Sequence, residues 1–273
     1  MASVDLVAFA LTGALTGMIG ALLGLGGGVF LVPLLALGFG IEPRTAVAAS
    51  LVAVVTSSST ATMVNMRRGL VNIPLAFSLL LATSVGSLAG SNFAHHISTR
   101  ALYIIFASTL FVVSLIVTSR SGKRNVIDDA TMDTGALGGR IEEEGKTLSY
   151  RMKRLPVAMV VSLIAGGISG LLGVGGGVIQ VPVLNSFCGI PIRVAAATSA
   201  FMIGPTASIS AFLYLSRGDM DPLITAAVAV GSLPGSIFGS WLSRHIAVRS
   251  IKGILATSLL LVAVRLSIAA FWM

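Results

Sequence analysis

Long apolar runs separated by short polar stretches follow one another along most of the chain. Unbroken apolar runs occupy residues 44–65, 72–94, 98–118, 193–215, 221–243 and 247–271. Each is long enough to cross a bilayer as an α-helix, which needs about 20 residues. The runs lack the alternation of apolar and polar residues found in the strands of a transmembrane β-barrel. The pattern therefore predicts an all-α integral membrane protein.

Two further apolar segments, at about 5–38 and 156–188, are interrupted by glycine. The interruptions contain three consecutive glycines each, Gly26–Gly28 in the first segment and Gly175–Gly177 in the second. Backbone amide and carbonyl groups cannot stay unpaired against lipid. Each glycine run therefore predicts a helix break that is either packed inside the protein or lines a polar cavity.

The two glycine runs belong to a duplication that extends over much of the chain. At one constant spacing, and without gaps, Gly24 corresponds to Gly173, Pro33 to Pro182, Arg44 to Arg193, Ser50 to Ser199, Arg68 to Arg217, Gly86 to Gly235 and Gly90 to Gly239. Roughly a third of the positions are identical over about 84 residues, which indicates an internal repeat. We expect two pseudo-symmetric halves, each a glycine-broken helical hairpin or broken helix followed by three transmembrane helices.

A polar segment separates the halves and completes the expected organisation. Residues 1–118 form the first transmembrane repeat, 119–154 a polar linker and 155–273 the second repeat. The linker is rich in both basic and acidic residues. We expect it to be solvated, partly disordered and cytoplasmic.

The route of the broken segments decides how the halves are oriented. If each crosses the membrane once, the repeats run parallel, and Arg193, Arg244, Arg249 and Lys252 lie outside when the linker is cytoplasmic. If each enters and returns on one side, the repeats are inverted and these four residues become cytoplasmic. The positive-inside rule favours the inverted arrangement, with both termini outside. A segment of 19 residues before Gly20 could also span alone, so both arrangements stay open.

Composition supports a membrane protein and narrows the functional classes. Hydrophobic residues make up 55% of the chain and charged residues 10%, whereas soluble proteins carry about 25% charged residues. The net charge of +8 is assigned mainly to loops, where basic residues set orientation, so no nucleic-acid partner is expected. Cys188 is the single cysteine, which excludes an internal disulfide or a zinc cluster. Without a Cys/His pair, a carboxylate pair or a His-rich cluster in the apolar runs, we predict no enzyme, metal or cofactor.

The duplicated motif resembles the sulfite exporter TauE/SafE family. The resemblance rests on Gly-Leu-Leu-Gly-x-Gly-Gly-Gly-x-x-x-x-Pro in both halves, followed by Ala-Ala-Ser-Leu at 48–51 and Ala-Thr-Ser-Ala at 197–200. It covers essentially the whole chain outside the linker. It implies a multi-pass permease of the bacterial inner membrane that moves sulfite, sulfonates or related organic anions.

The glycine breaks carry the candidate chemistry. A short helix starting near Val29, and its counterpart near Val178, would direct unpaired amide groups and a positive dipole end at a shared cavity, which suits an oxyanion. The alternative is two close helix crossings that need only small residues. Hydroxyl groups of the following helices and two arginines at helix entrances complete the candidate site. The predicted substrate-binding residues are Gly26, Gly27, Gly28, Ser50, Gly175, Gly176, Gly177, Gln180, Thr198, Ser199, Arg44 and Arg193.

These observations predict a permease that exports a small sulfur-containing or organic anion by alternating access between the halves. The expected partners are this anion and the lipid bilayer, with a homo-oligomer left open. Alternatives are an anion channel on the same path, a proton-coupled anion carrier or a membrane scaffold. No acidic residue lies at the centre of a predicted helix, whereas ion-coupled carriers commonly place one there. We therefore expect export driven by the membrane potential alone.

Overall fold

The computed structural model describes residues 3–119, 134–143, 146–243, 245 and 248–272. The first half contains α1 (Ser3–Leu23), α2 (Gly28–Pro33), the π-helical turn η1 (Leu34–Gly38), α3 (Pro43–Met66), α4 (Ile73–Phe93), the 3-10 turn η2 (Ala94–His96) and α5 (Thr99–Ser119). The strands β1 (Gly139–Glu143) and β2 (Lys146–Tyr150) follow. The second half contains α6 (Leu155–Leu172), α7 (Gly177–Ser186), α8 (Ile192–Ser216), α9 (Pro222–Leu242) and α10 (Val248–Trp272).

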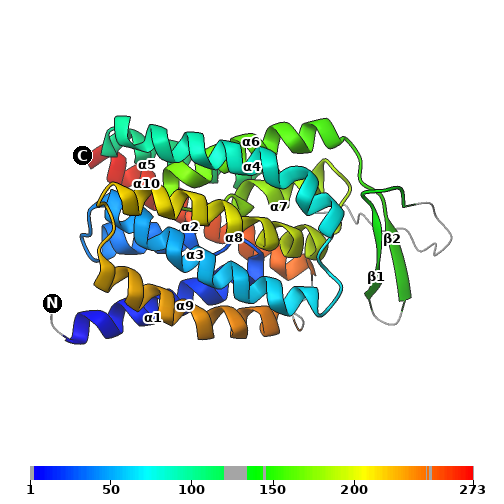
Figure 1. Ribbon diagram of the computed structural model, residues 1–273, viewed down its shortest axis with the longest axis horizontal. Helices are drawn as coiled ribbons and strands as arrows, with labels where there is room; N and C mark the ends of the chain where they lie inside the picture. Colours follow the sequence, from blue (N-terminus) through cyan, green and yellow to red (C-terminus); the bar gives the residue numbers. More distant parts are fainter. Residues whose placement is uncertain (1–2, 120–133, 144–145, 244, 246–247, 273) are drawn as a thin grey trace.

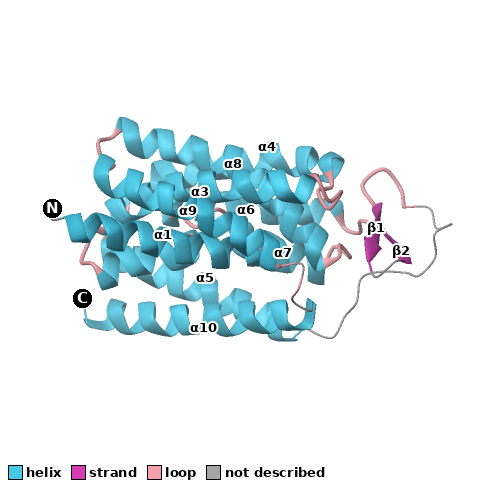
Figure 2. Cartoon of the chain, turned by 90° about the horizontal axis from the view of Figure 1, so that it is seen from below, coloured by secondary structure: helices cyan, strands magenta, loops and turns pink. Residues whose placement is uncertain are grey.

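The helices form one elongated bundle with two distinct ends (Figures 1 and 2). Both chain termini lie at one end, here called the terminal end, and the β-hairpin lies at the other, here called the linker end. Within the described residues, seven helices are long and apolar enough to cross a membrane. Large apolar side chains such as Leu81 and Phe212 are exposed on the outside of the bundle, where lipid would cover them. The predicted all-α integral membrane fold is confirmed.

Each broken segment turns back toward the end from which it started. In the first half, the ring of Phe39, just after η1, lies 4.9 Å from the ring of Phe9 in α1, measured between centroids. In the second half, the Lys153 amide donates to the Cys188 carbonyl at 2.8 Å, which joins the residues before α6 to those after α7. The two segments are therefore helical hairpins. The α1–α2 hairpin opens at the terminal end and the α6–α7 hairpin at the linker end (Figure 1).

Glycines let the long arm of each hairpin pack against a helix of the other half. A Cβ atom on Gly235 of α9 would lie 2.0 Å from the Ala14 carbonyl oxygen of α1. A Cβ atom on Gly90 of α4 would lie 1.9 Å from the Gly167 carbonyl oxygen of α6. Real side chains cannot occupy these positions, so the glycines of the pairs Gly86/Gly90 and Gly235/Gly239 let the helices approach closely.

Within the linker, which was expected to be partly disordered, the described residues are ordered. Strands β1 and β2 form an antiparallel hairpin, and Ile141 and Tyr150 are buried. The Asn72 side-chain amide, in the α3–α4 loop, donates to the Leu137 carbonyl at 3.0 Å and to the Tyr150 hydroxyl at 3.1 Å. Residues 120–133 and 144–145 lie outside the described part.

Candidate functional site

The two glycine breaks have the same backbone conformation in both halves. Gly24, Gly26 and Gly27 have φ angles of 73°, 78° and 86°, and Gly173, Gly175 and Gly176 have φ angles of 71°, 83° and 71°. These values lie in the left-handed region, which residues with a Cβ atom rarely adopt. Glycine is therefore required here by the shape of the backbone, and α2 and α7 begin one residue later, at Gly28 and Gly177.

The structure brings the two breaks into direct contact at the buried centre of the bundle. A Cβ atom on Gly28 would lie 2.2 Å from the Gly173 carbonyl oxygen, and one on Gly177 would lie 2.6 Å from the Gly24 carbonyl oxygen. All residues of Gly26–Gly28 and Gly175–Gly177 are buried. Six of the predicted site residues therefore meet, although they come from distant parts of the chain.

Two apolar side chains cover the contact between the breaks. Val54 of α3 and Ile203 of α8 both lie within 4 Å of the position that a Cβ atom would take on Gly26, and the same holds for Gly175. They occupy corresponding positions of the two halves. The sequence reasoning missed them because it searched for polar groups. The sequence signal for them is that Val54 and Ile203 follow their glycine runs at the same spacing.

The breaks of both halves leave several amide groups without partners. Among the described residues, no acceptor is found for the amide groups of Gly26, Gly27, Gly175 and Gly176, whereas the Gly177 amide donates to the Gly175 carbonyl at 2.8 Å. The Ser169 hydroxyl is likewise buried without a partner, and its Cβ atom lies 3.6 Å from the Cβ position of Gly176. Clustered amide and hydroxyl donors of this kind suit the oxygens of an anion.

Two carbonyl groups of the breaks receive hydrogen bonds from serine hydroxyls. The Ser50 hydroxyl of α3 donates to the Gly173 carbonyl at 2.9 Å. The Ser57 hydroxyl, also of α3, donates to the Gly26 carbonyl at 2.7 Å. Ser50 is one of the predicted site residues, whereas Ser57 is not.

Gln180 and Ser199 form a buried polar brace beside the second break. The Ser199 hydroxyl donates to Gln180 Oε1 at 3.1 Å, and Gln180 Nε2 donates to the Thr83 hydroxyl at 3.3 Å. This chain joins α7 to α8 and α4. The position that corresponds to Gln180 in the first half is Leu31, so the brace exists in one half only.

The other predicted site residues lie away from the breaks. The Thr198 hydroxyl accepts a hydrogen bond from the backbone amide of Asn72 at 3.0 Å, where α8 contacts the α3–α4 loop. Arg44 and Arg193 lie at the starts of α3 and α8, at opposite ends of the bundle (Figure 1). Arg44 donates to the His95 carbonyl at 3.2 Å.

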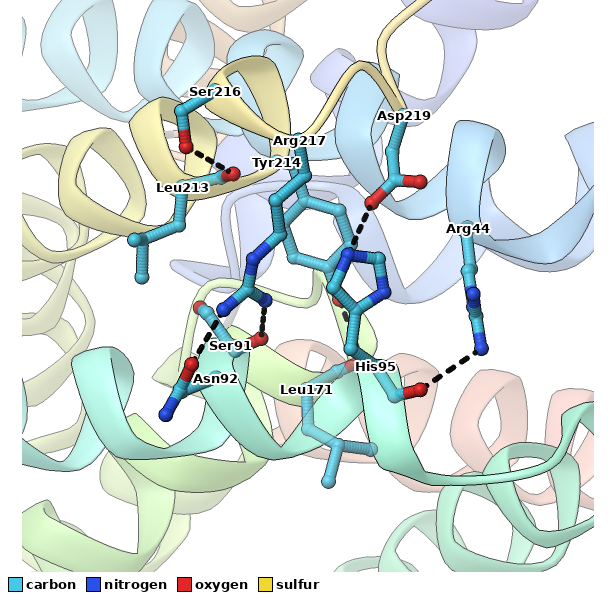
Figure 3. A network of polar contacts seen from close by, with 10 residues as sticks. All are labelled: Arg44, Ser91, Asn92, His95, Leu171, Leu213, Tyr214, Ser216, Arg217 and Asp219. Atoms are coloured by element: carbon cyan, nitrogen blue, oxygen red, sulfur yellow. Dashed lines mark hydrogen bonds and ion pairs between the residues drawn. The ribbon is translucent and has the colours of Figure 1, made fainter.

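A second polar cluster joins α4, α8 and the tip of the α6–α7 hairpin at the terminal end (Figure 3). Arg217 donates to the Ser91 carbonyl at 2.9 Å, and the Tyr214 hydroxyl donates to the Leu171 carbonyl at 3.4 Å. His95 Nε2 lies 3.5 Å from Asp219 Oδ2.

The linker end has a counterpart to one of these contacts, because Arg68 donates to the Ser240 carbonyl at 2.9 Å. The duplicated arginines Arg68 and Arg217 therefore bond corresponding carbonyl groups at opposite ends. Among the residues that the structure describes, no group of three or more His, Cys, Asp or Glu side chains is placed to hold a metal ion.

Comparison with known proteins gives one family over nearly the whole chain. The family model described as Sulfite exporter TauE/SafE matches residues 9–266. The probable membrane transporter protein YunE of Bacillus subtilis is 23% identical over 93% of this chain and 94% of its own length. A probable membrane transporter protein of Xylella fastidiosa is 25% identical over 96% of this chain and 93% of its own.

A plant relative matches more closely over a shorter region. The sulfite exporter TauE/SafE family protein 6 of Arabidopsis thaliana is 42% identical over 76 residues, which are 28% of this chain and 17% of its own. No solved structure matches the chain.

Proposed function

The chain belongs to the sulfite exporter TauE/SafE family, and from this premise we propose that it exports a small sulfur-containing or organic anion across the bacterial inner membrane. Its family and its relatives make it a multi-pass membrane transporter. One observation carries the choice of an anion. The two breaks meet at the buried centre, and the polar groups that they leave without partners include amide groups of both halves.

An anion would bind at these amide groups without a buried cation. Amides of Gly26, Gly27, Gly175 and Gly176 approach from both halves, and the unpartnered Ser169 hydroxyl adds a donor at the second break. Neutral donors hold a sulfite or sulfonate group less tightly than an arginine would, which allows release on the far side. In the closed conformation Val54 and Ile203 cover the contact, so binding requires the breaks to separate.

The two halves act as inverted repeats that open in turn. This is supported by the hairpins, which enter from opposite ends of the bundle (Figure 1). It is also supported by the paired contacts of Arg68 and Arg217, which close the linker end and the terminal end in corresponding ways. Movement of one half against the other would break one of these contacts while the other holds, which is alternating access.

The distribution of charge supports a cytoplasmic linker. Basic residues gather at the linker end, among them Arg67, Arg68, Arg140, Arg151, Lys153, Arg154 and Arg193. Toward the terminal end the described basic residues are fewer, namely Arg44, Arg100, Arg217 and Arg265. Because basic loops remain in the cytoplasm, the linker end faces inward and both termini face outward.

The membrane potential supplies the driving force. None of the acidic residues that the structure describes lies in the interior of a helix, so none of these carboxylates is placed to carry a coupling proton or sodium ion. An anion that leaves a negative-inside cell gains about 2.3 kcal/mol per charge per 100 mV. This is enough for export without a second ion.

Thermal unfolding of the purified protein with a panel of anions tests the proposed site. Sulfite, methanesulfonate, sulfate and acetate are compared as sodium salts at equal ionic strength, with gluconate as the reference. Ligand binding raises the unfolding temperature in proportion to RT ln(1 + [L]/Kd). We expect sulfite or methanesulfonate to stabilise the protein and Gly176→Leu to lose this effect. Equal unfolding temperatures with all anions would contradict the proposed site.

A further inference from the structure

Two serines of α3 occupy carbonyl groups on both sides of the contact between the breaks. Ser57 bonds the Gly26 carbonyl at 2.7 Å, in the first half. Ser50 bonds the Gly173 carbonyl at 2.9 Å, in the second half. Both side chains are at most 1% exposed. One helix therefore supplies a hydroxyl donor to each break.

The corresponding residues of α8 do not do this, so the arrangement does not follow from the duplication alone. Ser199, which corresponds to Ser50, donates to Gln180. Thr206, which corresponds to Ser57, donates to the carbonyl groups of Met202 and Ile203 in its own helix at 3.0 and 3.1 Å. The α3 serines thus have a role at the breaks that their counterparts lack.

The Ser50 hydroxyl lies where the breaks meet. A Cβ atom on Gly28 would lie 2.8 Å from Ser50 Oγ and 2.2 Å from the Gly173 carbonyl oxygen. The serine, the first break and the second break therefore share one contact point. A change in this hydroxyl acts directly on the polar groups that face the proposed anion.

The sign of the charge that a helix break attracts depends on which backbone groups remain unpaired. Unwound carbonyl groups bind sodium ions and protons in transporters, whereas amide groups at helix ends bind anions. A hydroxyl that donates to a carbonyl reduces the ability of that oxygen to bind a cation or repel an anion. With the Gly26 and Gly173 carbonyl groups occupied in this way, these two oxygens are less available to a cation, while the amide groups of both breaks remain available to an anion.

We propose that Ser50 and Ser57 are the positioning residues that make the paired breaks accept anions and exclude sodium ions. They act through the Gly173 and Gly26 carbonyl groups and need not touch the substrate. The inference rests on the proposed anion transport and adds to it the residues that determine its charge selectivity.

Parallel flux measurements in proteoliposomes test this role. Entry of radiolabelled sulfite and of radiolabelled sodium is measured for the wild type, Ser50→Ala and Ser57→Ala. We expect each alanine variant to lower the ratio of sulfite flux to sodium flux by at least about tenfold, because an unpaired buried carbonyl then faces the site. Sodium entry should rise above that of empty vesicles.

Two buried hydroxyls serve as controls. Thr206→Val removes the counterpart of Ser57, whose hydroxyl bonds only its own helix. Ser58→Ala removes a neighbouring hydroxyl that bonds the Val55 carbonyl at 3.1 Å. Both variants should keep the wild-type flux ratio. An equal fall of the ratio in these controls would overturn the inference.

A second pair of variants separates the hydroxyl from effects on folding. Ser57→Thr keeps the hydroxyl and Ser57→Val removes it, with nearly the same added volume. We expect the threonine variant to retain anion selectivity and the valine variant to lose it. If the alanine and valine variants lose sulfite flux but keep the wild-type ratio, the serines are merely structural and the inference is wrong.

The same vesicles distinguish this failure from failure of the proposed function. A wild type that transports sulfite while the serine variants keep its selectivity overturns the inference and leaves the anion permease intact. A wild type that carries neither sulfite nor methanesulfonate contradicts the permease, and the inference falls with it.

Discussion

At single positions, the glycines of the breaks are required for two different physical reasons. Gly176 has a φ angle of 71°, but the nearest atom to a Cβ on it, the Ala165 carbonyl oxygen, would be 3.4 Å away. Only the backbone conformation excludes a side chain there. Gly28 lies in helical conformation, and a Cβ on it would be 2.2 Å from the Gly173 carbonyl oxygen. There the opposite break excludes a side chain.

This difference predicts distinct effects of alanine at the two positions. Gly176→Ala should cost about 1–2 kcal/mol of stability, since the left-handed conformation is strained for alanine. Gly28→Ala should in addition force the breaks apart and weaken sulfite binding at least about tenfold by loss of the paired donors. Thermal unfolding with and without sulfite measures both effects.

Gly218 provides the matched control for strain alone. Its φ angle is 78°, and no atom lies within 4 Å of the position of its Cβ. Gly218→Ala should therefore lower the unfolding temperature about as much as Gly176→Ala and leave sulfite binding unchanged. If Gly28→Ala binds sulfite as the wild type does, the breaks do not form the site.

The sequence predicted the glycines that meet, but it predicted the side chains around them less well. Duplication identified Ser50 and Ser199, and the structure places both beside a break or its brace. Thr198 was predicted with them because it is adjacent in the motif. Successive residues of a helix point about 100° apart, so Ser199 reaches Gln180 while Thr198 reaches Asn72. Adjacency in a motif did not separate these two directions.

At the scale of helices and strands, the thickness of the bilayer determines how long a spanning helix must be. The lengths of the apolar runs therefore predict the helices. The apolar run at 44–65 became α3 (Pro43–Met66), and the run at 221–243 became α9 (Pro222–Leu242). The linker hairpin was not predictable in the same way. It is short, and its order depends on contacts with the bundle, such as those of Tyr150 and Asn72.

Asn72 holds the linker hairpin with one part of its side chain and caps α4 with the other. Its Nδ2 donates to Leu137 and Tyr150, while its Oδ1 accepts from the Leu75 amide at 3.0 Å. Asn72→Asp should keep the cap and lose the hairpin contacts. We expect proteolysis of the linker to accelerate about tenfold while the bundle stays folded.

The pKa of the Tyr150 phenol also reports on the contact between Asn72 and the linker hairpin. Burial raises the pKa of Tyr150, and the hydrogen bond from Asn72 opposes part of this increase. Asn72→Ala removes both the donor and the cap, so it should destabilise α4 as well as the hairpin. If Asn72→Asp protects the linker as well as asparagine does, the side-chain amide does not hold the hairpin.

At the scale of the whole molecule, the orientation in the membrane can be read from single cysteines. Burial raises the pKa of the Cys188 thiol to about 11, and Cys188 is fully buried. Because thiolates are the reactive form, the native cysteine should resist maleimide in folded protein. Cysteines introduced elsewhere can therefore be labelled without removing it.

Glu42→Cys at the terminal end and Arg140→Cys at the linker end test the orientation, since both positions are exposed. We expect an impermeant maleimide to label position 42 in intact cells, and position 140 only after the membrane is opened. The wild type is the control for Cys188. Labelling of position 140 alone in intact cells would place the linker outside and reverse the proposed orientation.

The central claim is that the paired breaks carry an anion whose movement is driven by the membrane potential. Efflux of methanesulfonate from proteoliposomes tests it most directly, because this anion keeps one negative charge at every pH near neutrality. An inside-negative potassium diffusion potential of about 100 mV should accelerate efflux, whereas a pH gradient without a potential should not. Efflux that follows the pH gradient and ignores the potential would contradict the account.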